Sequence, residues 1–193
     1  MAGDNSDVDL MMRVKRGDRE AFNSLVERYR KSLINFIFRF TCNEAASEDL
    51  AHEVFLKVFK SAERYEPKAE FSTWLYRIAS NSALNFLRDQ RNRALVPIGG
   101  DSEDGEEAPR IDLADRQALV EEQLIEQERV RTIRKAVASL PDQQRLALVL
   151  TKYQGLSLRQ TAAVLKSSEP AVKSLIFRAY STLREKLVSV VSI

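Results

Sequence analysis

Apolar residues recur at the three-to-four-residue spacing of amphipathic helices along most of this sequence, and few residues interrupt that spacing. The chain has only 6 Gly and 5 Pro in 193 residues, which leaves few places for tight turns, and helix-forming Leu, Ala, Glu, Arg and Lys dominate it. A hydrophobic content of 44% is enough to bury a core. We therefore expect an all-α protein.

One segment breaks the helical pattern. Residues 95–112, LVPIGGDSEDGEEAPRID, combine a Gly-Gly pair, two prolines and dense acid with few apolar residues, so they cannot support a core. The sequence thus predicts a helical domain over residues 1–93, an acidic flexible linker over 94–112 and a second small helical domain over 113–193.

Charge is segregated along the chain although the formal net charge is only +2. From Lys57 to Arg93, eight basic residues face four acidic ones; from Ala94 to Val130, three Arg face eleven Asp and Glu; from Arg159 to Lys186, six basic residues face two acidic ones. Two basic modules therefore flank an acidic connector, and basic modules suit nucleic acid.

The first domain is expected to contain four helices. A short helix precedes Gly17, and a longer one runs from about Arg19 to Phe40 with Asp18 as its N-cap. A third, opened by the Ser47 segment, runs to Lys60, and a fourth runs from about Ser72 to Arg91. In the second domain, a helix begins at Pro141 and has Gly155 as its C-cap. Its core candidates are Leu146, Val149, Leu150 and Tyr153.

The following segment predicts a helix-turn-helix. Ser157 and Gln160 form a capping box that opens a short helix ending at Leu165, and a basic helix begins near Glu169, with Pro170 in its first turn. Two short helices joined by about three residues match a DNA-binding unit whose second helix enters the major groove. Lys173, Ser174, Phe177 and Arg178 lie on or near the face opposite the expected helix contacts, and Arg159 in the first helix is a further DNA-binding candidate. An amphipathic hairpin with a solvated basic face is the competing interpretation, and Lys166 stands in the turn where Gly is common.

A second candidate surface combines aromatic and basic residues between Tyr65 and Arg93. Aromatic faces stack unpaired bases, amides contact base edges and cations follow the backbone, as single-strand binding requires. The alternative interpretation is that Phe71, Trp74 and Ile78 are core residues, and for Trp74 we favour it over base contact. The predicted DNA-binding residues of this segment are therefore Tyr65, Lys68, Arg77, Asn81, Asn85 and Arg88.

Four segments, in order, resemble extracytoplasmic-function sigma factors. RVKRGDREAFNSLVERY (Arg13 to Tyr29) is a typical start for the family, and DLAHEVFLKVFK (Asp49 to Lys60) resembles its polymerase-binding helix. FSTWLYRIASNSALNFLRDQRNR (Phe71 to Arg93) resembles its promoter-melting region, and Leu156 to Leu183 resembles its C-terminal promoter-binding motif. The resemblance covers nearly the whole chain apart from the linker.

The resemblance implies a transcription initiation factor that joins core RNA polymerase. Its first domain would capture the melted strand of the minus-ten element, and its second would bind minus-thirty-five duplex DNA. It also implies an anti-sigma protein as regulator. By the matching motif, the residues that face the polymerase are Asp49, His52, Glu53, Phe55 and Leu56, with Phe55 alternatively a core residue.

This sequence departs from the family pattern at several positions. His52 stands where Gln is usual, which keeps a hydrogen-bonding group but admits a pH-dependent charge. Glu169-Pro170-Ala171 replaces a Gly-Thr pattern, and Leu175 and Tyr180 occupy sites that are commonly basic. These differences predict fewer contacts with duplex DNA.

Other protein classes fit less well. One Cys and one His cannot form a usual zinc site, and the chain has no glycine-rich phosphate loop or nucleophile-base pair, so we expect no cofactor and no enzyme. We also expect no signal peptide and no membrane insertion, and therefore a cytoplasmic protein. A response-regulator-like activator with the same helix-turn-helix is the main alternative, although it requires strands in residues 1–93. A helical protein-binding adaptor without DNA affinity is a third possibility.

Overall fold

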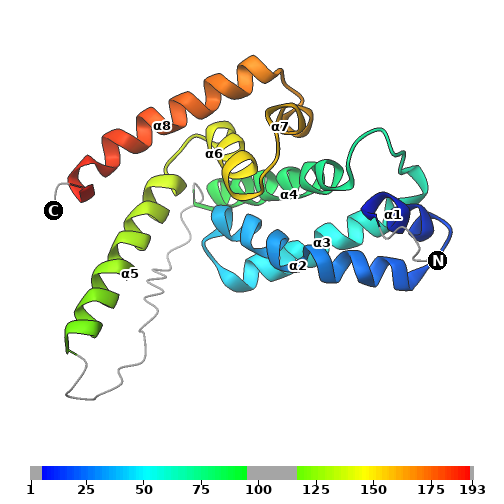
Figure 1. The fold of residues 1–193 in the computed structure, drawn as a ribbon, viewed down its shortest axis with the longest axis horizontal. Helices are drawn as coiled ribbons and strands as arrows, with labels where there is room; N and C mark the ends of the chain where they lie inside the picture. The colour runs from blue at the N-terminus through cyan, green and yellow to red at the C-terminus, as the bar shows by residue number, and fades with distance from the viewer. Residues whose placement is uncertain (1–5, 95–116, 192–193) are drawn as a thin grey trace.

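The computed structural model describes residues 6–94 and 117–191, and every regular element within these ranges is helical, which confirms the all-α class. The elements are α1 (Asp7–Lys15), α2 (Arg19–Thr41), α3 (Glu44–Lys60), the 3-10 turn η1 (Ala62–Arg64), α4 (Phe71–Ala94), α5 (Gln117–Ala138), α6 (Asp142–Leu148), the π-helical segment η2 (Val149–Tyr153), α7 (Leu158–Leu165) and α8 (Glu169–Val191). Helices α1 to α4 form a bundle, α7 packs on α4, α6 packs on α8, and α5 and α8 extend beyond the bundle (Figure 1). None of the helices in these ranges is both long and apolar enough to span a bilayer.

Capping side chains set the helix starts of the first region. The Asp18 carboxylate accepts a hydrogen bond from the Ala21 backbone N–H at 3.0 Å, which confirms the predicted N-cap of α2. Helix α3 begins earlier than expected, at Glu44, because Asn43 caps it through the Ala46 N–H at 2.8 Å. Ser47, expected to open this helix, is instead buried, with its hydroxyl 2.7 Å from the hydroxyl of Thr41.

The core of the first region comes from all four of its helices. Fully buried side chains include Met11 of α1, Phe36 of α2, Val54 of α3 and Leu75 of α4. An aromatic cluster joins α2 to α4: the Phe36 ring lies 5.2 Å from those of both Phe40 and Tyr76, measured between centroids. This packing holds the exposed faces of α3 and α4 on one rigid body.

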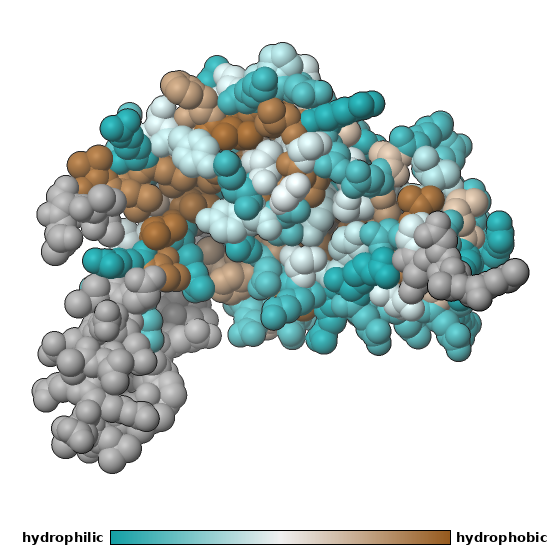
Figure 2. Space-filling model, viewed as in Figure 1, coloured by the Kyte–Doolittle hydropathy of each residue, from teal (hydrophilic) through white to brown (hydrophobic). Residues whose placement is uncertain are grey.

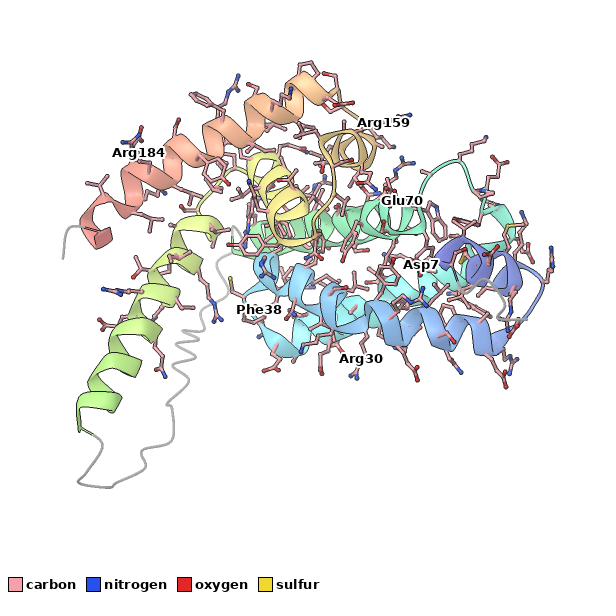
Figure 3. The ribbon with its side chains drawn as sticks, in the orientation of Figure 1. Asp7, Arg30, Phe38, Glu70, Arg159 and Arg184 are labelled. Carbon is pink, nitrogen blue, oxygen red and sulfur yellow. The ribbon has the colours of Figure 1, made fainter. Side chains whose placement is uncertain are left out.

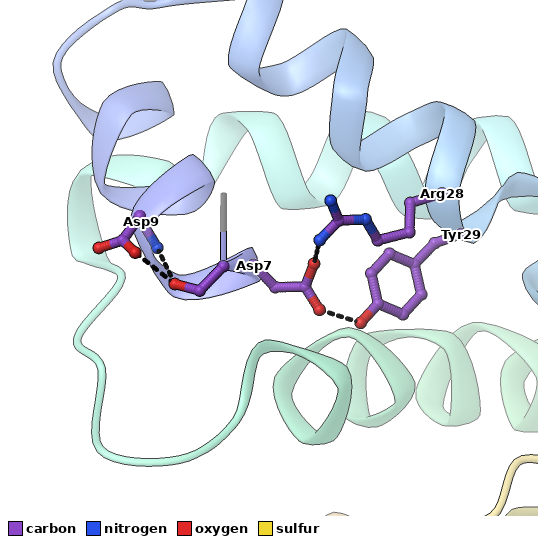
Figure 4. Close-up of polar contacts among 5 residues, drawn as sticks. Asp7, Asp9, Arg28 and Tyr29 are labelled. Carbon is purple, nitrogen blue, oxygen red and sulfur yellow. Dashed lines mark hydrogen bonds and ion pairs between the residues drawn. The ribbon is translucent and has the colours of Figure 1, made fainter. Parts of the chain in front are cut away.

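The N-terminal helix is tied to α2 by a polar cluster. The Asp7 carboxylate accepts hydrogen bonds from the Arg28 guanidinium and the Tyr29 hydroxyl (Figure 4). Burial raises the pKa of Tyr29, and the neighbouring Asp7 raises it further. The cluster therefore favours a protonated tyrosine that donates to the carboxylate.

The second region contains the predicted helix-turn-helix. Both halves of the capping box form: the Gln160 N–H donates to the Ser157 hydroxyl at 3.2 Å, and the Ser157 N–H donates to the Gln160 side chain at 2.8 Å. Helix α7 ends at Leu165, as expected, and α8 runs past the expected end at Lys186 to Val191. Lys166, in the turn, adopts a left-handed conformation with φ of 51°.

Replacing Lys166 with Gly is expected to stabilise the protein by about 0.5–1 kcal/mol. A side chain in the left-handed region costs roughly 1–2 kcal/mol, and the greater freedom of Gly in the unfolded chain offsets part of that gain. Urea unfolding measures the change. As control, Arg131→Gly in the exposed interior of α5 should lower stability by about 1 kcal/mol, and equal losses for both variants would contradict the strain at Lys166.

The two regions share a hydrophobic core, whereas the sequence predicted two separate domains. Leu146, Val149, Leu150, Leu156 and Val164 belong to the same buried cluster as the core of α1 to α4. The expected linker, residues 94–112, lies outside the described residues except for Ala94. The candidate DNA-binding and polymerase-binding surfaces thus belong to a chain whose two regions are packed together.

Candidate nucleic-acid and protein interfaces

The exposed face of α8 holds the four residues predicted to contact duplex DNA. Val172 and Ala179 are buried against the rest of the second region, whereas Lys173, Ser174, Phe177 and Arg178 are all exposed. Phe177 is 73% exposed, the highest value among the exposed large apolar side chains of the described residues. An exposed aromatic ring between cations costs hydration energy in the free chain, so this face is suited to a partner that offers both phosphate and apolar base edges.

Helix α7 contributes one further cation at the surface. Arg159 is exposed in the first turn of α7, and Figure 3 shows it at the outer edge of the second region. Gln143, Leu165, Lys166, Ser174 and Arg178 line a shallow groove beside the turn between α7 and α8. The basic and amide side chains thus continue from α8 onto the neighbouring surface.

A stripe of polar and basic residues follows α4. Arg77, Asn81, Asn85 and Arg88, called here the α4 stripe, fall within about 80° of arc on a helix of 3.6 residues per turn. Asn81, Asn85 and Arg88 are exposed. Arg77 is half-buried, because its guanidinium donates a hydrogen bond to the Ala163 carbonyl of α7 at 2.9 Å. The stripe is present as predicted, but the second region occupies one member of it.

The prediction of Tyr65 as an accessible stacking residue is wrong for this structure. Its side chain is 2% exposed and packs edge-on against Trp74, 5.1 Å away between ring centroids. Its backbone carbonyl accepts a hydrogen bond from the Lys15 ammonium at 2.9 Å, and burial raises the pKa of its hydroxyl. Pro67 predicted a loop correctly, but the loop folds the tyrosine inward. Lys68 stays exposed and pairs with Glu66 at 2.5 Å.

The neighbouring aromatic residues behave as core, in line with the alternative interpretation. Phe71 is fully buried, and its ring lies 5.3 Å from that of Tyr29. Trp74 and Ile78 are half-buried and pack on the same cluster. The single-strand candidate surface therefore consists mainly of amides and cations. In the stretch from Phe71 to Ala94, only Trp74 and Phe86 have partly accessible aromatic rings.

Helix α3 presents acidic and apolar groups side by side. Asp49, His52, Glu53 and Leu56 are exposed, and Glu53 pairs with Lys57 at 2.9 Å. Phe55 is only 7% exposed, so its prediction as a surface contact is wrong and its interpretation as core is correct. An edge of Phe55 still lines a groove between α2 and α3, with Arg30, Asp49 and His52 around it.

One exposed apolar residue of the α3 surface was not predicted from the sequence. Phe59 is 43% exposed, as is Leu56 one turn before it. Its ring lies 5.0 Å from that of Phe22 on α2. Leu56 and Phe59 are three residues apart, which places them on one helix face, and that spacing is the signal that could have identified the patch.

Apolar surface is also concentrated in the second region. Figure 2 shows it where α5, α6 and α8 meet, and Ile133 and Val188 are among the exposed large apolar residues. Tyr153, expected in the core, is the last residue of the π-helical segment and is 47% exposed; the Arg39 guanidinium lies over its ring, 4.0 Å from the centroid. Within the described ranges, no group of three or more His, Cys, Asp and Glu side chains is arranged to hold a metal ion.

Comparisons with known proteins match both helical regions to one family of proteins. The Sigma-70 region 2 family matches residues 25–93, and the Sigma-70, region 4 family matches residues 131–183. The RNA polymerase sigma-H factor of Pseudomonas aeruginosa is 32% identical over 191 residues, which are 97% of this chain and 96% of the relative. The ECF RNA polymerase sigma-E factor of Escherichia coli K12 is 33% identical over 185 residues, 94% of each chain.

Two solved structures share the fold. CnrH, determined in complex with the cytosolic domain of CnrY, has a TM-score of 0.70 and 24% identity over 96% of this chain and 99% of its own. The sigma factor RpoE of Bartonella quintana, determined with the anti-sigma factor NepR, has a TM-score of 0.64 and 21% identity over 86% of this chain and 96% of its own.

The fold and its two basic surfaces define a helical DNA-binding protein of transcription initiation. The chain belongs to the sigma-70 family, as an RNA polymerase sigma factor of the extracytoplasmic-function type. The response-regulator alternative is wrong, because the region 2 family matches the residues where a receiver domain would have to lie.

Proposed function

We propose that this chain binds core RNA polymerase through α3, holds the melted minus-ten strand on α4 and contacts minus-thirty-five duplex DNA with α8. The observation that supports it most is the α8 face, where Phe177 is exposed between Lys173 and Arg178. The proposal divides the chain, as the sequence predicted, into residues 1–93, a connector at 94–112 and residues 113–193. It places the protein in the cytoplasm as a regulatory factor without catalytic activity.

The α4 stripe is proposed to hold the unpaired strand. Asn81 and Asn85 offer amides that donate to and accept from base edges, and Arg88 offers a cation to the backbone. With Tyr65 buried, base stacking in this segment would depend on the accessible part of Trp74. Lys68 extends the positive surface into the loop before α4.

A regulatory partner is part of the proposal. RpoE of Bartonella quintana was determined with an anti-sigma factor, and the apolar surface of α5 and α8 around Ile133 and Val188 suits a protein partner. We propose that an anti-sigma protein binds this chain.

The polymerase surface is tested by the double variant Asp49→Ala, Glu53→Ala. Both carboxylates are exposed beside the apolar patch of Leu56 and Phe59, an arrangement typical of interface hot spots. We expect binding to core polymerase to weaken by about 1–3 kcal/mol per important contact, measured by fluorescence anisotropy of the labelled full chain.

The matched control for this variant removes two exposed carboxylates from α2, as Glu20→Ala, Glu27→Ala, and should bind core polymerase like wild type. Circular dichroism should show unchanged helicity for both double variants. If the α3 variant also binds core polymerase like wild type, α3 is not the polymerase surface.

A further inference from the structure

A cavity lies where α2, α5 and η2 meet. In Figure 1 the C-terminal half of α5 passes the C-terminal end of α2, and these two helices are in contact. The cavity has a volume of about 310 Å³, at the lower end of the range of ligand pockets. No lining residue in the described ranges belongs to α3, α4 or α8. The lining residues are Asn35, Phe38, Arg39, Cys42, Val130, Ile133, Arg134, Val137 and Tyr153.

The α5 side of the cavity is apolar. Val130, Ile133 and Val137 are spaced by three and four residues, which places them on one face of the helix. Val137 is buried, Val130 is half-buried and Ile133 is 43% exposed. Phe38, labelled in Figure 3, is half-buried at the end of α2 that contacts α5. These β-branched and aromatic side chains are stiff, so they offer a preformed surface to a flat apolar group.

Two guanidinium groups enter the cavity from different helices. Arg39 of α2 lies over the Tyr153 ring, 4.0 Å from its centroid, and Arg134 of α5 lies 5.6 Å from the Phe38 ring centroid. Arg39 also donates a hydrogen bond to the Asn35 carbonyl at 2.7 Å. Neither arginine forms an ion pair with any residue that the structure describes. Stacking on a ring holds a guanidinium in place while its remaining N–H groups can donate to an anion.

The charges around the cavity favour an anion over a neutral ligand. Residues 129–138 of α5 contain four Arg and Lys and no Asp or Glu. The C-terminal end of α2 carries the negative end of a helix dipole, but Arg145, only 4% exposed, donates a hydrogen bond to the Arg39 carbonyl there. The buried guanidinium therefore offsets the negative helix end, and the two lining arginines determine the sign of the local charge.

Cys42 marks one edge of the cavity. It ends α2 in a left-handed conformation with φ of 52°, and its side chain is exposed. The chain has no other cysteine, so a thiol reagent modifies this position alone. A group attached to Cys42 would occupy the cavity or block its entrance.

We propose that this cavity binds a small aromatic anion, with its ring against the apolar face of α5 and its acidic group bound by Arg39 and Arg134. The site is separate from the DNA-binding and polymerase-binding surfaces, and only Ile133 is shared with the apolar surface proposed for a protein partner. Because the lining comes from both regions, the ligand binds the chain with these regions in contact and stabilises that form.

The first test separates the acidic group from the ring. The probes are 8-anilinonaphthalene-1-sulfonate and N-phenyl-1-naphthylamine, which has the same rings without the sulfonate. In fluorescence titrations, the full chain should bind the sulfonate at one site and about tenfold more tightly than the neutral amine. The variant Arg39→Gln, Arg134→Gln should lose about tenfold in affinity for the sulfonate and keep its affinity for the amine.

The matched control for this variant is Arg129→Gln, Arg131→Gln. It removes the same charge from exposed positions of α5 that do not line the cavity. This control should bind both probes like wild type. Circular dichroism should show unchanged helicity for both double variants.

The second test locates the bound probe. Wild-type chain labelled with N-ethylmaleimide at Cys42 should lose its binding of the sulfonate, because the attached group fills the site. Cys42→Ser, treated with the same reagent, should bind the sulfonate like untreated wild type. Saturating sulfonate should also slow the labelling of Cys42 in the wild-type chain.

Three results would overturn the proposal. Equal wild-type affinity for the two probes, or unchanged sulfonate affinity of Arg39→Gln, Arg134→Gln, would mean that these arginines bind no anion. Loss of both probes by that variant, with helicity retained, would mean that the guanidinium groups only shape the cavity. Unchanged sulfonate binding after labelling of Cys42 would place the probe elsewhere on the chain.

Discussion

The double variant Lys173→Ala, Arg178→Ala is expected to lose about 2–4 kcal/mol of binding free energy for promoter duplex. Both side chains are exposed on α8, five residues apart and therefore about 140° from each other around the helix, so they cannot both point at one base pair. A lost phosphate contact should weaken binding to all DNA sequences alike and lower the slope of log affinity against log salt concentration by about 0.9 per charge. A lost base contact should instead cost about 1–3 kcal/mol of binding free energy on the preferred site and relax discrimination at one base pair.

The single variants separate these two roles. Titration of the full chain with core polymerase against promoter and scrambled duplexes, at several salt concentrations, gives affinity, slope and discrimination for each. Arg184→Ala is the matched control, because this exposed cation lies further along α8, on the outer surface in Figure 3. If neither Lys173→Ala nor Arg178→Ala changes any of the three quantities, the basic face of α8 is only solvated.

Replacing Phe36 with Ala is expected to destabilise the protein by about 3–5 kcal/mol. Phe36 is fully buried, and its ring packs against those of Phe40 and Tyr76, the two aromatic residues that also contact the second region. The loss combines the transfer free energy of the ring with the cavity it leaves. Chemical denaturation followed by circular dichroism measures it.

A conservative variant provides the control for this prediction. Phe36→Leu retains most of the apolar volume and should cost clearly less than Phe36→Ala. A loss below about 1 kcal/mol for Phe36→Ala would mean that the aromatic cluster is not packed as described between α2 and α4.

Local sequence signals predicted the helix-turn-helix well because its geometry depends on residues close in sequence. The Ser157 and Gln160 capping box and the end of α7 at Leu165 all follow from short-range rules. Lys173, Ser174, Phe177 and Arg178 are exposed as expected, since helical periodicity alone separates them from buried Val172 and Ala179. The start of α3 was missed because Asn43 and Ser47 are both good caps, and burial of Ser47 against Thr41 favours Asn43.

The wrong predictions concern residues whose burial depends on tertiary packing. Tyr65 follows a turn and precedes Pro67, which suggests an exposed loop, but contact with Trp74 buries it. Phe55 and Phe59 are four residues apart and look equivalent in sequence, yet only Phe55 is buried. Tyr153 was assigned to a regular helix, and the π-helical turn changes its direction.

The contact between the two regions could not be predicted from local pattern at all. Arg145 and Gln154 look like ordinary surface residues of an amphipathic helix, but their partners, Arg39 and Tyr76, are 106 and 78 positions away in sequence. Pairings at such separations depend on the assembled fold, and a single sequence contains no signal for them.

The most direct test of sigma-factor function is run-off transcription with purified core RNA polymerase on a library of promoter fragments. We predict that adding this chain produces defined transcripts from a subset of fragments that share one element near minus ten and another near minus thirty-five. Transcripts should be lost with Lys173→Ala, Arg178→Ala. Transcription no greater or more selective than that of core polymerase alone would contradict the account.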